Sequence, residues 1–137
     1  PWHLNGSTTW LDAERRHAVI NPDLNGKRPT NVPGWTLRAQ VRYRLAAVPG
    51  LSVEGALSHE GRRAVLPDES VMLPSWTRLD TALRYETGLR GKRAPWSLSV
   101  DNVANRRGFV ESPYQYSHIY LFPAAPRTVR LGLHAGF

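Results

Sequence analysis

Cysteine is missing from this chain of 137 residues, which excludes a disulfide framework and any thiolate metal site. Long apolar runs are missing as well, since no stretch approaches the roughly 18 residues of a membrane-spanning helix. This excludes a helical membrane protein but not a transmembrane β-barrel, whose strands alternate between apolar and polar residues. Lysine is scarce, so the net charge of +7 is carried mostly by arginine.

An initiator methionine and a signal peptide are also missing, because the chain opens directly on Pro1-Trp2. Its length suffices for one domain. We therefore expect the chain to be a piece of a longer precursor.

In the final segment, 127–137, the residues from Thr128 onward alternate between two sides, one of them apolar, and the chain ends on the aromatic Phe137. A period of two places the apolar residues on one side of an extended strand, whereas the 100° rotation per residue of a helix would scatter them. The same period recurs in five earlier segments, although Leu11 interrupts it in the first. We predict an all-β fold, an antiparallel up-and-down meander of about six strands at residues 2–14, 34–46, 50–61, 75–88, 94–104 and 127–137.

The connections between these segments fall into a long set and a short set. Residues 15–33, 62–74 and 102–126 form long connections, whereas residues 46–50 form a tight turn and Thr87 to Pro95 a moderate one. Loops longer than about 12–15 residues are uncommon in compact soluble domains. Long loops at one end and short turns at the other are typical of transmembrane barrels, whose long loops lie outside the cell. We therefore expect the long connections to be extracellular and the chain to end on the periplasmic side.

Seven aromatic residues on the apolar side fall at two levels under this topology. Five would lie at the periplasmic end: Trp2, Tyr43, Tyr85, Trp96 and Phe137. The other two, Trp10 and Trp35, would lie at the opposite end. Amphipathic rings gather at both interfaces of a membrane. We interpret these seven residues as membrane-interface aromatics. Trp76 is an exception, because it falls on the polar side.

The polar side of the predicted sheet carries charges of both signs. Its basic residues are Arg38, Arg42, Arg44, Arg78, Arg84 and Arg130, and its acidic residues are Glu54, Asp80, Glu86 and Asp101. A charge that faces lipid at mid-depth costs about 2–4 kcal/mol, so these side chains must face a wet interior. Acidic partners on the same side make charge pairing a sufficient explanation for the arginines.

Several longer motifs follow one another along the chain. They are Gly6-Ser-Thr-Thr-Trp10-Leu-Asp-Ala-Glu14, Gly26-Lys-Arg28, Asn31-Val-Pro33, Leu73-Pro-Ser-Trp-Thr-Arg-Leu-Asp80, Leu98-Ser-Val-Asp-Asn-Val-Ala-Asn-Arg-Arg107 and the ending from Pro126 to Phe137. Together they resemble the late barrel strands of TonB-dependent outer-membrane receptors, particularly siderophore receptors, over essentially the whole chain. One departure is Gly108, where the family usually has an aromatic residue.

The resemblance implies a protein of the Gram-negative outer membrane that actively imports ferric siderophores or similar chelates, with no enzyme activity and no cofactor. The resemblance also implies a 22-stranded barrel that is plugged by an N-terminal domain, and this domain contacts TonB. Residues 1–137 would then be the C-terminal portion of the barrel, without the plug domain and the earlier strands. The other implied partners are outer-membrane lipid, lipopolysaccharide and the barrel-assembly machinery, which reads a terminal aromatic such as Phe137.

The longest predicted loop is also the most aromatic. Its residues Tyr114, Tyr116, His118 and Tyr120 are candidates to line an extracellular vestibule and to stack on an aromatic siderophore. The alternative is that they pack the loop against its neighbours or the barrel rim. The sequence leaves both alternatives open.

The remaining reactive residues give weaker signals. The five histidines lie far apart and share no ligand spacing, so we expect no metal site. No carboxylate pair is placed in a cleft, and there is no nucleophile motif or phosphate-binding loop, so we expect no catalytic residue. Three arginine pairs near outer strand ends suit lipopolysaccharide phosphates, an anionic chelate or simple solvation: Arg15-Arg16, Arg62-Arg63 and Arg106-Arg107.

Two other functions fit parts of the sequence. The net charge of +7 and the interleaved aromatics suit a free-standing basic β-module that binds nucleic acid or another anionic partner. The arginines lie opposite the aromatics, however, so no stacking platform forms, and nucleic acid is not an expected partner. A small outer-membrane barrel enzyme fits less well, because about eight strands are the usual minimum for closure.

Overall fold

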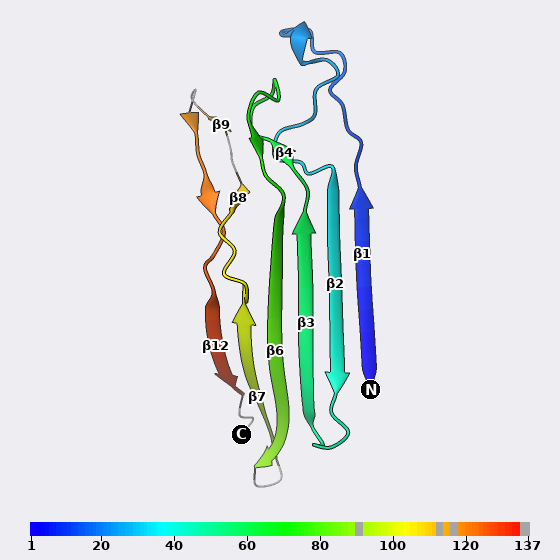
Figure 1. Ribbon diagram of the computed structural model, residues 1–137, viewed down its shortest axis with the longest axis vertical. Helices are drawn as coiled ribbons and strands as arrows, with labels where there is room; N and C mark the ends of the chain where they lie inside the picture. The colour runs from blue at the N-terminus through cyan, green and yellow to red at the C-terminus, as the bar shows by residue number, and fades with distance from the viewer. Residues whose placement is uncertain (90–91, 112–113, 116–117, 135–137) are drawn as a thin grey trace.

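The computed structural model describes residues 1–89, 92–111, 114–115 and 118–134. Within them, six long strands form one antiparallel sheet in the order β1-β2-β3-β6-β7-β12 (Figure 1). These strands are β1 (Trp2–Trp10), β2 (Trp35–Arg44), β3 (Leu51–Glu60), β6 (Trp76–Leu89), β7 (Lys92–Asp101) and β12 (Thr128–Leu133). Each long strand pairs with the long strands before and after it in the chain, so the predicted up-and-down meander is confirmed.

The register between the strands places their apolar residues on one face of the sheet. Leu4 lies opposite Val41, and Val53 lies opposite Leu83. Because side chains alternate with a period of two, a slip of one residue would exchange the two faces, so the pattern specifies the register. The sheet therefore has an apolar face and a polar face, as the alternation predicted.

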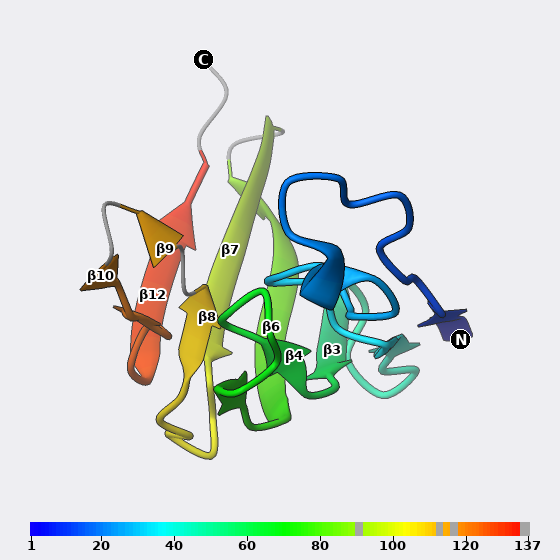
Figure 2. The ribbon, with the colours of Figure 1, turned by 90° about the horizontal axis from the view of Figure 1, so that it is seen from above.

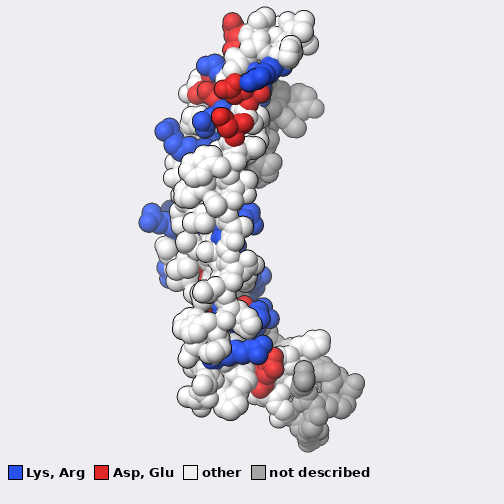
Figure 3. All heavy atoms as spheres, turned by 90° about the vertical axis from the view of Figure 1, so that its right-hand side faces the viewer, with Lys and Arg blue, Asp and Glu red and all other residues white. Residues whose placement is uncertain are grey.

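Nothing in the described part of the chain covers the apolar face. The strands stand in a single row when seen from above, and the molecule is narrow when seen from its edge (Figures 2 and 3). Large apolar side chains consequently stay exposed, such as Leu4 at 79% and Leu131 at 73%. A soluble domain would bury such a face against another layer of secondary structure.

The long strands differ from the prediction mainly at their ends. β1 stops at Trp10 rather than at residue 14. β7 stops at Asp101 rather than at residue 104, because Asn102 adopts a left-handed backbone conformation with φ of 53°. β12 is described as far as Leu133, and the predicted end of this strand at Phe137 lies outside the described residues.

At the lower end of Figure 1, β6 and β7 extend further than the sequence pattern predicted. The expected turn from Thr87 to Pro95 is wrong, because β6 and β7 remain paired as far as Leu89 and Lys92. In the turn between β2 and β3, Gly50 has φ of 85°, and a Cβ there would lie 2.6 Å from a backbone oxygen of β6. Only glycine fits this position.

The long upper connections contain short elements that the sequence pattern did not predict. They are the 3-10 helix η1 (Pro22–Leu24) and the strands β4 (Arg63–Ala64), β5 (Met72–Leu73), β8 (Phe109–Glu111), β9 (Tyr114–Gln115), β10 (His118–Ile119) and β11 (Phe122–Pro123). The strands pair as β4 with β5, β8 with β11 and β9 with β10. Among the described residues, no helix is long and apolar enough to cross a membrane.

The upper connections also hold most of the small buried core. Ala64, Val65 and Leu73 are buried there, in and beside the β4–β5 pair. A parallel bridge between Thr30 and Ala64 joins the first long connection to the second. The upper end of the sheet is therefore a packed structure and not a set of free loops.

Candidate functional site

Ion pairs on the polar face join neighbouring strands. The carboxylate of Glu54 on β3 lies 2.6 Å from Arg42 Nε on β2 and 3.1 Å from Arg84 Nε on β6. Glu54 is 7% exposed, so the two guanidinium groups enclose it. Two further pairs lie on the same face: Arg78 with Asp80 and Arg130 with Asp101. Most of the predicted polar-face arginines thus have an acidic partner, and one carboxylate links three strands.

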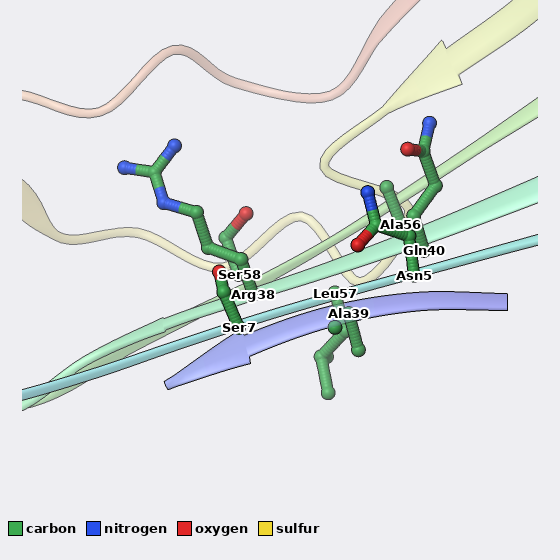
Figure 4. A pocket seen from close by; sticks show the side chains of 9 residues that line it. Asn5, Ser7, Arg38, Ala39, Gln40, Ala56, Leu57 and Ser58 are labelled. Carbon is green, nitrogen blue, oxygen red and sulfur yellow. The ribbon is translucent and has the colours of Figure 1, made fainter. Parts of the chain in front are cut away.

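A shallow hollow of about 320 Å³ lies over β1, β2 and β3 on the polar face (Figure 4). Ser7, Arg38 and Ser58 stand in one row of the register and point to this side, whereas Leu57 points to the other. Arg38 takes part in none of the ion pairs found among the described residues. The hollow therefore presents hydroxyl groups and one positive charge to whatever fills the space in front of the sheet.

Asn102 holds together the two ends of the connection between β7 and β12. It is 1% exposed, and its side-chain amide donates to the carbonyl oxygens of Arg106 and Ala125, each at 3.0 Å. Its Oδ1 accepts from Arg106 N at 2.9 Å, and its backbone N donates to Asp80 Oδ1 at 2.8 Å. A buried amide whose hydrogen bonds are all made fixes the backbone around it. The sequence signal for this role is an asparagine directly after a strand, since asparagine tolerates the left-handed conformation.

Trp76, the aromatic residue on the polar face, packs on Gly108 at the base of the same connection. A Cβ at position 108 would lie 2.3 Å from Trp76 Cδ1, so the indole fills the space that a side chain there would take. The guanidinium carbon of Arg78 lies 5.9 Å from the centre of the indole, within the range of a cation–π interaction. The two exceptions noted in the sequence, Trp76 and Gly108, are therefore partners in space.

The pair Arg62-Arg63 divides between two environments. Arg63 is 6% exposed, and its Nη1 lies 2.6 Å from Glu60 Oε2. Its Nη2 donates to the carbonyl oxygen of Phe109 at 2.8 Å, which ties the β3–β6 connection to the β7–β12 connection. Arg62 is exposed. A solvated strand end is thus the wrong interpretation for Arg63, because a buried guanidinium requires partners of this kind.

The candidate ligand residues lie at the upper end, in the connection between β7 and β12. His118 and Tyr120 are exposed, with ring centres 6.5 Å apart and planes at 70°. The backbone of Tyr114 pairs with Ile119, while its side chain lies outside the described part of the chain, as does the whole of Tyr116. The described rings are accessible to a ligand, and a ligand-binding role for the four residues stays a prediction.

The described aromatics of the apolar face lie at its two ends. Two pairs meet at the lower end and one at the upper end: Trp2 with Tyr43, Tyr85 with Trp96, and Trp10 with Trp35. The ring centres of the first pair are 4.3 Å apart, and those of the last pair are 5.8 Å apart. The two levels match the predicted topology, and their placement at membrane interfaces stays a prediction.

His59 belongs to the upper aromatic group, which the sequence pattern did not indicate. Its ring centre lies 4.7 Å from that of Trp35, and its Nδ1 lies 2.7 Å from Thr77 Oγ1. Trp35 Nε1 donates to Thr8 Oγ1 at 2.9 Å. Hydrogen bonds thus engage Trp35 Nε1 and His59 Nδ1, as is usual for aromatic side chains with a polar atom at an apolar–polar boundary.

Metal sites and catalytic sites each require a particular arrangement of side chains. No three His, Cys, Asp or Glu side chains gather there as metal ligands. In the turn between β4 and β5, the hydroxyl and the backbone N of Ser70 donate to Asp68 Oδ1, and these hydrogen bonds lower the pKa of Asp68. Ion pairs, exposed rings and a bare apolar face suit binding and membrane insertion.

Residues 2–105 match the family described as TonB dependent receptor-like, beta-barrel. The chain belongs to this family of TonB-dependent receptor barrels. Members of the family are β-barrels of the Gram-negative outer membrane, and they are transporters rather than enzymes. The predicted family and the predicted location are thus confirmed.

Relatives found by sequence and by structure cover nearly the whole chain. The ferrichrome receptor FcuA of Yersinia enterocolitica is 28% identical over 134 residues, which are 98% of this chain and 17% of FcuA. The ferric preacinetobactin receptor BauA of Acinetobacter baumannii matches 96% of this chain with a TM-score of 0.82, and the siderophore receptor PiuA of the same organism matches 96% with a TM-score of 0.77. Each is 21% identical to this chain, so these two matches show the fold. The chain spans less than a fifth of the length of all three proteins.

Proposed function

We propose that the chain is the C-terminal portion of a receptor barrel that takes up ferric siderophores or similar chelates by TonB-dependent active transport. One observation carries the proposal: the three relatives, found independently by sequence and by structure, are named as receptors for ferrichrome, for ferric preacinetobactin and for siderophores. The plug domain and the earlier strands would come from a part of the receptor outside residues 1–137.

The two faces of the sheet support this assignment. In the proposed receptor, the apolar face contacts outer-membrane lipid, and the polar face borders the interior through which a chelate passes. Glu54 and its two arginines lie on the polar face, where water or protein keeps them solvated. The same charges on the lipid side would cost about 2–4 kcal/mol each at mid-depth.

The proposed partners follow from this placement. The ferric chelate would approach from the upper end, where the long connections lie. TonB would contact the N-terminal part of the receptor, and lipid and lipopolysaccharide would surround the barrel. The barrel-assembly machinery would insert it, with the aromatic residue Phe137 as part of the signal.

Uptake in iron-limited cells tests the proposal. We expect deletion of the gene for the full-length receptor to abolish uptake of one class of ⁵⁵Fe-labelled siderophore and to leave the others unchanged. A plasmid copy should restore that uptake only in cells that have functional TonB. A receptor whose loss changes the uptake of no ferric chelate would contradict the proposed function.

We propose further that the connection between β7 and β12 contacts the chelate through Tyr114, Tyr116, His118 and Tyr120. Stacking is worth about 0.5–1.5 kcal/mol for each ring beyond its area burial, so replacing the three tyrosines by alanine should weaken affinity more than tenfold. Phe122→Ala, in the same connection, is the matched control and should retain affinity. An affinity of the triple variant within twofold of the parent, with normal assembly, would assign the rings to packing of the loop.

A further inference from the structure

A groove of about 500 Å³ opens at the upper ends of β1, β2 and β3. The indoles of Trp10 and Trp35 line one part of it, and Arg28, Arg62 and Asp12 line another. The groove is therefore amphipathic, with aromatic rings and charged groups that reach the same space.

The aromatic part of the groove is continuous with the apolar face. Trp10 and Trp35 form the upper aromatic pair of that face, and their ring centres are 5.8 Å apart. Trp10 is 78% exposed, so its ring is open to an acyl chain. Because the rings lie on the apolar face, the groove opens beside the surface that faces lipid and not on the polar face.

The basic part of the groove holds two guanidinium groups. Gly34 leaves room for the first, because a methyl group there would lie 3.2 Å from Arg28 Nη1. Arg62 is exposed, in contrast to Arg63, which is buried against Glu60. Among the described residues, neither Arg28 nor Arg62 takes part in an ion pair.

The acidic groups nearby do not cancel this charge. Asp12 lines the groove and supplies one negative charge against the two positive ones. Glu69 accepts a hydrogen bond from the backbone N of Arg28 at 2.8 Å, and not from its guanidinium. Guanidinium groups bind phosphate oxygens through two parallel N–H donors, so two of them with a surplus of positive charge suit a phosphate better than a neutral headgroup.

We propose that this groove binds a phosphorylated lipid of the outer leaflet, with a lipid A phosphate between Arg28 and Arg62 and an acyl chain over Trp10 and Trp35. The proposal rests on the membrane placement of the apolar face and goes beyond the uptake function. It identifies the lipid and not the ferric chelate as the occupant, because a chelate travels along the opposite face of the sheet.

The test uses the full-length receptor in nanodiscs of phosphatidylcholine that contain either bis-phosphorylated or dephosphorylated lipid A. Bound lipid A is counted by native mass spectrometry across a titration. We expect the parent receptor to bind the phosphorylated form at least about tenfold more tightly than the dephosphorylated form. The double variant Arg28→Ala/Arg62→Ala should lose this preference. Arg44→Ala/Arg127→Ala removes two exposed arginines outside the groove and should retain it.

Arg28→Lys/Arg62→Lys keeps the charge without the forked donors and should keep only part of the preference. A parent receptor that binds both lipids equally would overturn the proposal without any variant being made. Equal losses in the groove variant and in its control would also overturn it, since they would indicate diffuse charge attraction. Ferric siderophore binding is measured on the same samples, so a receptor that binds lipid A but no chelate refutes the uptake function alone.

Discussion

A methyl group at position 108 should loosen the base of the connection between β7 and β12. In the Gly108→Ala variant, the new Cβ would lie 2.3 Å from Trp76 Cδ1 and 2.8 Å from Trp76 Nε1, whereas carbon atoms in contact are about 3.5–4.0 Å apart. The backbone cannot easily retreat, because Gly108 O accepts from Ala124 N at 2.7 Å. Overpacking of this kind costs about 1–3 kcal/mol.

Hydrogen–deuterium exchange of the full-length receptor measures this cost at the site. A loss of about 1–3 kcal/mol corresponds to roughly 5- to 150-fold faster exchange if opening is local. We therefore expect this acceleration in peptides that cover residues 102–111, with other strands unchanged. Gly88→Ala is the matched control, because a Cβ there meets nothing within 4 Å.

A second substitution decides whether the indole is the cause. Trp76→Ala in the Gly108→Ala background removes the clash. The loss of local stability measured by exchange in the double variant should therefore be smaller than the sum of the losses in the two single variants. Exchange in Gly108→Ala within twofold of the parent would refute the reasoning. Strict additivity of the two substitutions would refute it as well.

Three further predictions concern the sheet. Glu54→Ala leaves Arg42 and Arg84 without their shared carboxylate and should lower the free energy of unfolding by about 1–2 kcal/mol, a modest figure because both arginines are about half exposed. The midpoint of denaturant unfolding measures this loss. An unchanged midpoint would show that the ion pairs contribute nothing to stability. Phe137→Ala should lower the amount of assembled receptor detected by surface labelling, and equal abundance would show that the ring is dispensable. The isolated chain should associate or precipitate without detergent, because its apolar face is bare and β1 and β12 each have an unpaired edge; a detergent-free monomer in sedimentation would contradict this.

The long strands could be predicted because a single physical rule governs them. Lipid on one side and water or protein on the other require residues of alternating polarity, and this requirement repeats over every strand. The two-residue strands in the upper connections are too short to show a period. Their pairing depends on contacts between distant segments, such as the hydrogen bond from Arg63 to Phe109 O.

The packing at the upper end could not be derived from single positions. Trp76 and Gly108 each break a local pattern, and neither exception predicts the other, because the contact between them is made only when β6 and the connection after β7 meet. Adjacent arginines show the same limit. Arg62 is exposed and Arg63 is buried, although the sequence presents them as a pair.

The bare apolar face has a consequence for how this family changes over time. A residue in a protein core must match the shape of fixed neighbours, and a single methylene group too many or too few is costly. Lipid chains are fluid and adapt to any apolar outline, so a strand that faces them can exchange leucine, valine and isoleucine freely. A barrel wall can thus keep its shape, with a TM-score of 0.82 to BauA, while its sequence drifts to 21% identity.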